Sequence, residues 1–211
     1  MSVKFIVGKV VKDTVGCRPT VSRLADRLAS SLQNFNYHGS VGQTNSKQLN
    51  IDFDKPFFTV LETKGWHCER DPMVDMESLG EDWGSPKADA ILTHESKKGQ
   101  RIVLEIEKSN KKTLWFDFIK LLMFIESGHA SAGVILCPLN YAHKLGVWNL
   151  FEEARRYKKY LLRFAGVAKE KLGLIVLLGY EQRIVSDDGK SKLWDAEESK
   201  RIKQESIGSK S

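Results

Sequence analysis

The feature that most constrains the fold is a pair of short strand patterns joined by a single turn. Residues 88–94 read ADAILTH, residues 101–107 read RIVLEIE, and ESKKGQ stands between them. A short polar connection that contains Gly99 predicts an antiparallel hairpin in which this glycine adopts a positive φ. A sheet built around this hairpin is therefore the centre of the expected fold.

Two carboxylates, Glu105 and Glu107, flank Ile106 at the end of the second strand. Side chains alternate between the two faces of a strand, so both acids are expected on one face, together with Val103. Like charges on one face repel each other. Either both carboxylates face water, or a cation holds them in place.

The pairing of the two strands decides whether a third acid joins them. With a three-residue turn of residues 97–99, Asp89 falls opposite Glu107 and Ile91 falls opposite Glu105, on a shared face. A two-residue turn would instead move Asp89 to the other face. The Lys-Lys-Gly order of the turn favours the three-residue form, so we predict one acidic cluster of Asp89, Glu105 and Glu107.

The segments that follow the hairpin alternate between helix and strand patterns. They are an amphipathic helix at 113–127, a buried strand at 132–137, a basic helix at 149–164 and an apolar strand at 173–179. This order predicts an α/β fold with a mixed central sheet flanked by helices. Before the hairpin we expect a strand at 3–11, a helix capped by Thr20, a loop at 34–50, a short helix from Asp54 to Gly65 and irregular chain at 66–86.

Charge and cysteine content exclude some classes of protein. The chain of 211 residues has a net charge of +6, three scattered cysteines and no apolar run of about 18 residues. We therefore expect a protein of a reducing cytoplasm, with no membrane segment and no signal peptide. Basic runs at 108–112 and 155–163 suit a polyanionic partner, although each can also be a solvated face.

Three acids that converge on one sheet position predict metal chemistry. Hard oxygen ligands suit Mg²⁺, which also binds phosphate oxygens, and Mn²⁺ is expected to substitute for it. In this hypothesis Asp89 and Glu105 bind the metal, with the Ile106 backbone carbonyl as a further ligand. Glu107 would then accept a proton from the attacking water.

The pattern Asp89…Glu105-Ile106-Glu107 resembles the PD-(D/E)xK nuclease core, with Glu107 in the place of the usual lysine. It is similar to the type II restriction endonucleases of the BamHI, BglII and BstYI group. The resemblance also rests on Ser109-Asn110, on ETKGW at 62–66 and on VILCPLN at 134–140. It implies one endonuclease domain at 1–185, with a catalytic core at about 55–180. The charged residues 186–211 are expected to form a mobile tail.

The resemblance also implies a substrate and partners. The substrate would be double-stranded DNA, cut in both strands of a short palindrome with a GATC centre, inside a bacterial or archaeal cytoplasm. A homodimer would perform the cleavage, and a separate DNA methyltransferase would protect the host.

Further site residues follow from the same resemblance. Ser109 and Asn110 would reach base edges, while Lys111 and Lys112 would contact phosphates. Glu62 is either a further acid of the site or a glutamate that faces water. The helix at 113–127 is either a core helix or also part of the dimer interface.

Two other functions fit the same residues. One is a nuclease of the same core that acts in DNA repair or recombination on a DNA structure instead of a sequence. The other is a DNA-binding protein without catalysis, in which the acids form a solvated face. Cleavage of plain duplex at one palindrome would identify the restriction enzyme.

Overall fold

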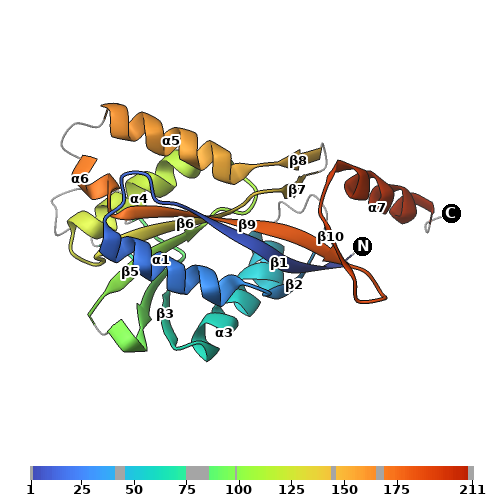
Figure 1. Ribbon diagram of the computed structural model, residues 1–211, viewed down its shortest axis with the longest axis horizontal. Coiled ribbons are helices and arrows are strands. Elements are labelled where there is room, and N and C mark those ends of the chain that lie inside the picture. Colours follow the sequence, from blue (N-terminus) through green and yellow to red (C-terminus); the bar gives the residue numbers. More distant parts are fainter. Residues whose placement is uncertain are drawn as a thin grey trace.

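A mixed β-sheet forms the centre of the protein (Figure 1). The computed structural model describes residues 2–40, 46–74, 86–97, 99–143, 146–164 and 169–208. The strands of the sheet follow the order β2-β1-β9-β6-β5-β4-β3, and β10 pairs with β9. Their bounds are β1 (Ser2–Asp13), β2 (Asn36–Ser40), β3 (Trp66–Arg70), β4 (Ala90–His94), β5 (Arg101–Ile106), β6 (Ala132–Pro138), β9 (Ile175–Val185) and β10 (Ser191–Leu193). A separate hairpin joins β7 (Tyr141–His143) to β8 (Gly146–Trp148).

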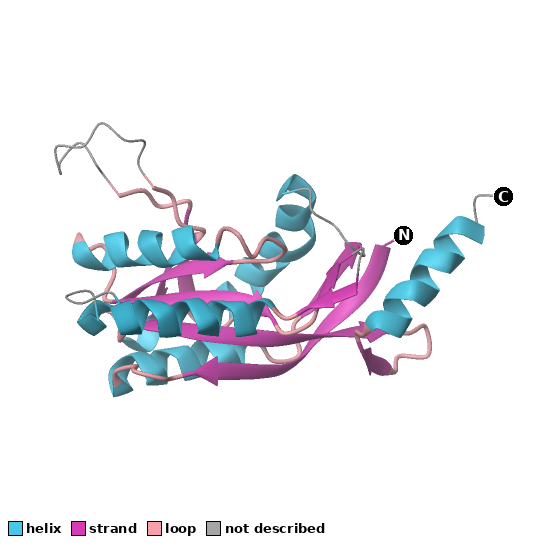
Figure 2. Ribbon diagram, turned by 90° about the horizontal axis from the view of Figure 1, so that it is seen from above, coloured by secondary structure: helices cyan, strands magenta, loops and turns pink. Residues whose placement is uncertain are grey.

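Helices cover both faces of this sheet, as Figures 1 and 2 show. One face packs on α1 (Pro19–Leu32) and α3 (Lys55–Thr63), and the other on α4 (Leu114–Glu126) and α5 (Leu150–Phe164). The remaining helical segments are α2 (Ser46–Leu49), η1 (Asn50–Asp54), η3 (Glu95–Lys97), α6 (Lys169–Leu172) and α7 (Ala196–Gly208). The expected α/β fold with a mixed, helix-flanked sheet is confirmed. No described helix has the length and apolar character needed to cross a membrane.

The alternation along β5 determines which layer each side chain enters. Ile102 and Leu104 belong to the core under α1 and α3, whereas Val103 belongs to the core under α4 and α5. Glu105 has the parity of Val103, so its side chain points to the α4 layer. The acid pair is therefore covered by a helix, and the structure does not place it on an open sheet face.

The predicted pairing of β4 with β5 is wrong by two residues. Ile91 pairs with Val103, and Thr93 with Arg101, so the connection is longer than three residues. Lys98 of the predicted turn lies outside the described residues, while Gly99 has the expected positive φ of 92°. A shift of two residues keeps every side chain on its face. The predicted common face is therefore retained, and the observed pairing, extended by one residue, sets Asp89 level with Glu105.

The second half of the chain follows its sequence pattern closely. The expected helices and strands correspond to α4, β6, α5 and β9. Gly128 follows α4 with a φ of 76°, and the Asn149 side chain caps α5 by accepting a hydrogen bond from the Glu152 N–H at 3.0 Å. Strong local signals, namely apolar runs, a glycine stop and a cap, determine these elements.

Three expectations for the first half need correction. The stretch 34–50 contains β2, and 66–86 contains β3; residues 41–45 and 75–85 lie outside the described part of the chain. Helix α1 begins at Pro19, so Thr20 lies inside the helix and is not its cap. Both unexpected strands gain their stability from distant partners, because Tyr37 stacks on Phe5 and β3 pairs with β4. Local composition carries no signal of such pairing.

The segment after residue 185 is ordered through two apolar anchors. Where a charged, mobile tail was expected, β10 and α7 occur, and Trp194 and Ile202 are buried. The Asn140 side chain donates hydrogen bonds to the carbonyls of Gln182 and Trp194, at 2.9 and 2.8 Å. Trp194 also packs edge-on against Phe5. Residues 209–211 lie outside the described part, and the division at residue 185 stays a prediction.

Candidate active site

Asp89 and Glu105 meet where β4 begins and β5 ends. The Asp89 Oδ2 accepts a hydrogen bond from the Ile106 backbone N–H at 2.6 Å, so this carboxylate reaches across to the acid-bearing strand. Glu105 lies one residue earlier on β5 and is buried, with 4% of its surface exposed. Two of the three acids predicted from the sequence are thus held together by the hairpin itself.

The electrostatic state of Glu105 is unfavourable without a further cation. Burial, followed by repulsion from the Asp89 carboxylate, raises the pKa of Glu105 to about 9. Its Oε1 is a buried atom with no hydrogen-bond partner among the described residues. Buried polar atoms almost always have a partner, and an exception indicates an unfilled binding site or a functional role.

Helix α4 contributes two charged residues that the sequence reasoning missed. The Lys120 Nζ lies 2.6 Å from the Glu105 Oε2 and 3.3 Å from the Asp117 Oδ1. Burial raises the pKa of Asp117 to about 6, with further repulsion from Glu107 and Asp89. A signal was present in the sequence, because Asp117 falls among the apolar residues of this helix at the spacing of its buried face.

Glu107 holds the loop that follows β5. Its Oε1 accepts hydrogen bonds from the backbone N–H groups of Ser109 and Asn110, at 2.9 and 2.7 Å. Its Oε2 accepts a hydrogen bond from the Thr113 hydroxyl, at the start of α4. The carboxylate therefore ties three donors of residues 109–113 together, and its predicted role as a general base stays a prediction.

The predicted DNA-binding residues all lie on this loop. Asn110, Lys111 and Lys112 are exposed, and the Asn110 Oδ1 accepts a hydrogen bond from the Lys112 N–H at 3.1 Å. The Ser109 side chain hydrogen-bonds to the Tyr141 hydroxyl, which partly offsets the burial that raises the pKa of this tyrosine to about 12. Ser109 thus anchors the loop, while the next three side chains reach solvent beside the acids.

Glu62 does not join the acids in the structure. It is exposed at the end of α3, and its charge acts on Cys68 of β3. Asp54, the last residue of η1 directly before α3, is buried, and burial raises its pKa, with a further contribution from repulsion by Asp89. The Lys108 Nζ contacts both Asp54 carboxylate oxygens at 2.8 and 2.9 Å, so Lys108 is committed to this ion pair.

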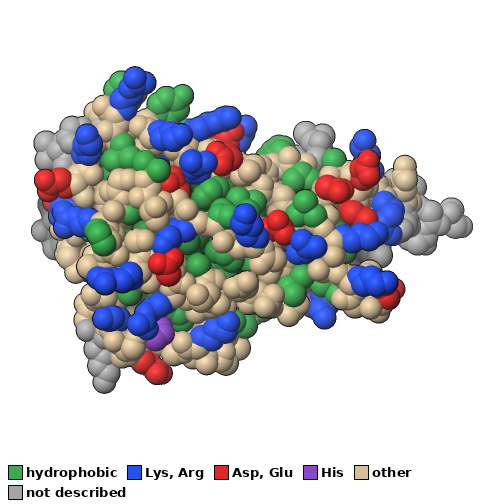
Figure 3. All heavy atoms as spheres, in the orientation of Figure 1, with side chains coloured by type: hydrophobic (Ala, Val, Ile, Leu, Met, Phe, Trp, Pro, Cys, Tyr) green, Lys and Arg blue, Asp and Glu red, His purple; other side chains and the backbone are tan. Residues whose placement is uncertain are grey.

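The basic run on α5 is less available than its sequence suggests. Arg155 and Arg156 pair with Glu152 and Glu153 of the same helix. Lys158 is buried, and its Nζ donates to the Ile175 carbonyl at 2.8 Å. Lysine and arginine side chains still gather along the α5 edge of the surface, together with hydrophobic side chains (Figure 3).

The available donor atoms suit Mg²⁺ better than a metal ion that protein side chains enclose completely. Within the described ranges no group of three or more His, Cys, Asp and Glu side chains is arranged to hold a metal. Mg²⁺ is commonly held by one or two carboxylates, with water and substrate phosphate completing its shell. Asp89 and Glu105 supply two carboxylates, and the unpartnered Oε1 of Glu105 is a free ligand atom for such an ion.

The raised pKa values predict that the metal-free protein becomes less stable as the pH rises. Both Glu105 and Asp117 lose their protons near pH 4 when unfolded, but only near pH 9 and pH 6, respectively, when folded. The folded state therefore binds more protons in this window, and the free energy of unfolding falls with increasing pH. One extra bound proton between pH 6 and pH 8 corresponds to at most about 3 kcal/mol.

Urea denaturation in EDTA at pH 6, 7 and 8 measures this dependence. The variant Glu105→Gln, which cannot titrate, should lose most of the slope. Equal slopes for the wild type and the variant would contradict the assignment of a raised pKa to Glu105.

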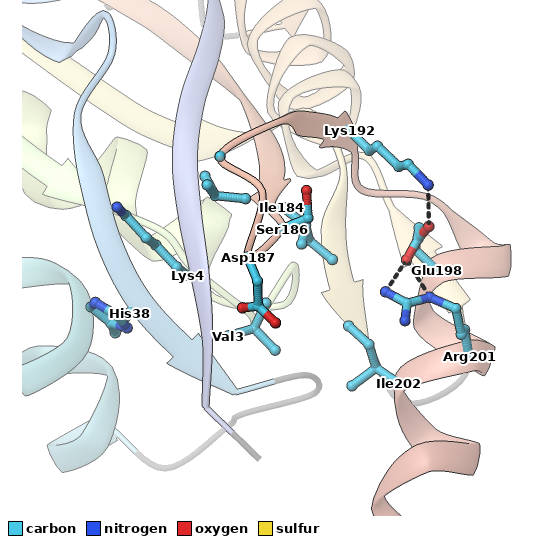
Figure 4. Close-up of a pocket in the computed structure, with 12 residues that line it drawn as sticks. Val3, Lys4, His38, Ile184, Ser186, Asp187, Lys192, Glu198, Arg201 and Ile202 are labelled. Carbon is cyan, nitrogen blue, oxygen red and sulfur yellow. Dashed lines mark hydrogen bonds and ion pairs between the residues drawn. The ribbon is translucent and has the colours of Figure 1, made fainter.

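A separate cavity of about 670 Å³ lies far along the sheet from these acids, between β1, the β9–β10 turn and α7 (Figure 4). Lys4, His38 and Lys192 line it, and Glu198 pairs with Arg201 at 2.8 Å. Lys192 also lies 3.8 Å from Glu198.

Comparison with known proteins adds an independent finding. Residues 19–174, which are 156 of the 211 residues, match the family described as restriction endonuclease BglII/BglIII. A search of curated proteins found no match. The matched region includes the β4–β5 hairpin, the loop at 107–113 and helices α4 and α5.

Proposed function

The chain belongs to the restriction endonuclease BglII/BglIII family and is on that ground a site-specific DNA endonuclease, and we propose that it cuts both strands of a short palindrome with a GATC centre. The hydrolysis would depend on Mg²⁺, for which Mn²⁺ substitutes. The observation that carries the proposal is the buried Glu105 carboxylate beside Asp89, with one oxygen unpartnered, directly before an exposed loop suited to DNA.

In this proposal Asp89 and Glu105 hold the cation, together with the Ile106 backbone carbonyl. A bound divalent cation polarises the scissile phosphate and lowers the pKa of a nearby water. The Asp89 side chain is oriented by the Ile106 N–H, and Glu105 is oriented by Lys120. Both carboxylates are therefore fixed before the substrate arrives, which reduces the reorganisation needed in the transition state.

Glu107 remains the candidate general base. Each carboxylate oxygen has two lone pairs, so its hydrogen bonds to the loop leave room for a water. The same bonds link the acid site to the residues proposed to read DNA, because Glu107 holds the backbone of Asn110. Docking of the loop on a matching sequence would thus act directly on the position of Glu107.

Sequence reading is assigned to the loop after β5. The Asn110 amide pairs with an adenine edge in the major groove, with Ser109 holding the loop, while Lys111 and Lys112 contact phosphates. The Asn110 Oδ1 keeps a lone pair for such a contact beside the bond that it accepts from Lys112 N–H. A separate DNA methyltransferase would protect the host DNA from this activity.

Asn110→Ala and Lys112→Ala are expected to fail in different ways. Loss of a base contact costs about 1–3 kcal/mol of discrimination, so Asn110→Ala should bind its own site nearly as weakly as altered sites. Lys112→Ala, which loses a phosphate contact, should bind all sequences more weakly by the same factor. The slope of its logarithmic binding constant against the logarithm of salt concentration should become smaller by about one. Fluorescence anisotropy with cognate and altered duplexes over a salt series measures both. An unchanged sequence preference in Asn110→Ala would contradict the base-reading role.

A homodimer is proposed as the active form, because one domain with one acid site needs a twofold partner to cut a palindrome in both strands. Helix α4 serves the core through Leu114, Phe118 and Leu121, but its outer side exposes Phe116. Next to Phe116 in the chain, Trp115 lines an apolar hollow with Tyr160, Leu161 and Phe164 of α5, and Phe164 is 76% exposed. A second copy of the chain is the occupant that fits the symmetry of the substrate.

Digestion of phage DNA tests the proposal. The protein is incubated with Mg²⁺, with Mn²⁺ or with EDTA, and the ends of the products are sequenced. Discrete metal-dependent fragments that share one palindrome are expected. Cleavage only at branched or damaged DNA would favour a repair nuclease, and binding without cleavage in any metal would contradict the enzymatic function.

A further inference from the structure

The acid site contains a lysine, although not at the expected place in the sequence. The related nuclease core carries a lysine two residues after the second acid, and this chain has Glu107 there. In the structure the carboxylate of Glu107 accepts hydrogen bonds from the loop at 109–113, and it supplies no positive charge beside Glu105. The cation next to Glu105 is instead Lys120, from the second turn of α4.

The placement of Lys120 follows from how α4 begins. The Thr113 hydroxyl donates to Glu107 and also lies 2.8 Å from the Asn110 carbonyl oxygen, so the helix starts as a continuation of the acid loop. Asp117 and Lys120 lie three residues apart and therefore face the same side of the helix. This side is turned to the end of β5, where the Lys120 Nζ lies 2.6 Å from the Glu105 Oε2.

Three carboxyl groups share one amine at this position. The Lys120 Nζ contacts Glu105 and Asp117, and Asp89 bonds to the backbone of the residue next to Glu105. A purely structural pair of this kind is seldom stabilising, because desolvation offsets most of its attraction. The arrangement is better suited to binding an additional cation and a phosphate.

The Lys120 side chain can also reach outward. About a quarter of it is exposed, whereas only 5% of the Glu105 side chain is exposed. Its ammonium stands on a flexible four-carbon stem, so it can turn from one partner to another. Once a divalent cation neutralises Glu105 and Asp89, the nearest new negative charge is the DNA phosphate at the same site.

We propose that Lys120 is the active-site amine of this nuclease: it pairs with Glu105 in the metal-free protein and contacts the scissile phosphate in the loaded complex. The proposal rests on the proposed nuclease function and deepens it. Lys120 would supply from a helix the positive charge that the strand lacks at Glu107. Stabilisation of the charge that develops on the phosphate is worth about a hundredfold or more in rate.

Single-turnover cleavage of a duplex that carries the wild-type cleavage site tests this role. Lys120→Ala and Lys120→Met are expected to cut about a hundredfold more slowly than the wild type. In EDTA their dissociation constants for the same duplex should stay within about threefold, because Lys120 is then engaged with Glu105 and not with phosphate. The matched control is Lys171→Ala, which removes another lysine paired with a glutamate of α4, Glu126, outside the site.

Chemical rescue separates catalysis from a structural role. Ethylammonium should raise the cleavage rate of Lys120→Ala at least tenfold, and the effect should saturate as the ethylammonium concentration increases. It should not accelerate Lys171→Ala. Thermal melting confirms that each variant is folded, and Lys120→Arg serves as the second variant. Cleavage by Lys120→Ala within threefold of the wild type overturns the proposal. So does a slow but folded variant that neither ethylammonium nor Lys120→Arg restores. If the wild type itself does not cut, the proposed function fails, and not the role of Lys120 within it.

Discussion

Glu105→Gln is expected to reduce DNA cleavage by about a thousandfold or more and to leave the fold intact. Replacing the carboxylate by an amide of the same shape removes a charged metal ligand, and the loss of about 4 kcal/mol of transition-state stabilisation corresponds to a thousandfold in rate. The side chain still fills its buried position, and the variant loses a carboxylate that repels Asp89. The melting temperature of the metal-free variant should therefore equal or exceed that of the wild type.

The control for this variant is a matched change at an acid outside the site. Glu62→Gln alters a glutamate that is exposed at the end of α3, and it should cut at the wild-type rate. Single-turnover rates in Mg²⁺, with binding of the uncut duplex in EDTA, give the comparison. Cleavage by Glu105→Gln within tenfold of the wild type would show that the metal is held elsewhere. Loss of activity in Glu62→Gln would instead show that Glu62 is part of the active site.

Phe116→Asp is expected to convert the proposed homodimer into monomers and to abolish double-strand cleavage. Phe116 is 66% exposed on the outer side of α4, the helix that also carries Lys120. A central aromatic residue at an interface contributes about 2–4 kcal/mol, and a charge buried in its place adds to the loss. The dissociation constant of the dimer should rise by about a hundredfold or more.

Sedimentation velocity and plasmid digestion measure this change together. The variant should sediment as a monomer and should lose most of its plasmid linearisation, while the protein stays folded. Ile51→Asp is the matched control, because Ile51 is similarly exposed, at 53%, but lies before α3. A Phe116→Asp protein that remains dimeric would place the interface on another surface.

The sequence predicted those parts of the site that depend on local patterns and on the alternation of side chains along a strand. The alternation in VLEIE put the acids on one face, and the assignment of Asp89 to that face survived a pairing error because the error was an even number of residues. The helix and strand order after residue 107 was readable because each element has its own stop signal, such as Gly128. These features depend only on neighbouring residues.

The remaining features depend on contacts between distant segments. Lys120 and Asp117 were read as parts of an amphipathic helix, because the sequence does not show which strand that helix covers. The hydrogen bonds that Glu107 accepts from the loop after β5 were not foreseen, and its predicted role as general base stays a prediction. Trp194 stands in a charged segment, and its contacts with Phe5 and Asn140, which help this segment to pack, come from distant parts of the chain. In each case the partner is set by tertiary structure.

The most direct test of the central claim is the position of manganese in a complex with DNA. Crystals of the protein with a duplex carrying its cleavage site would be grown in EDTA and then soaked in Mn²⁺, and anomalous diffraction would locate the ion. The account predicts a manganese peak bound by the carboxylates of Asp89 and Glu105, with the Lys120 ammonium moved from Glu105 to the DNA phosphate. A peak bound by other residues, with Glu105 still paired to Lys120 while the DNA is cut, would contradict it.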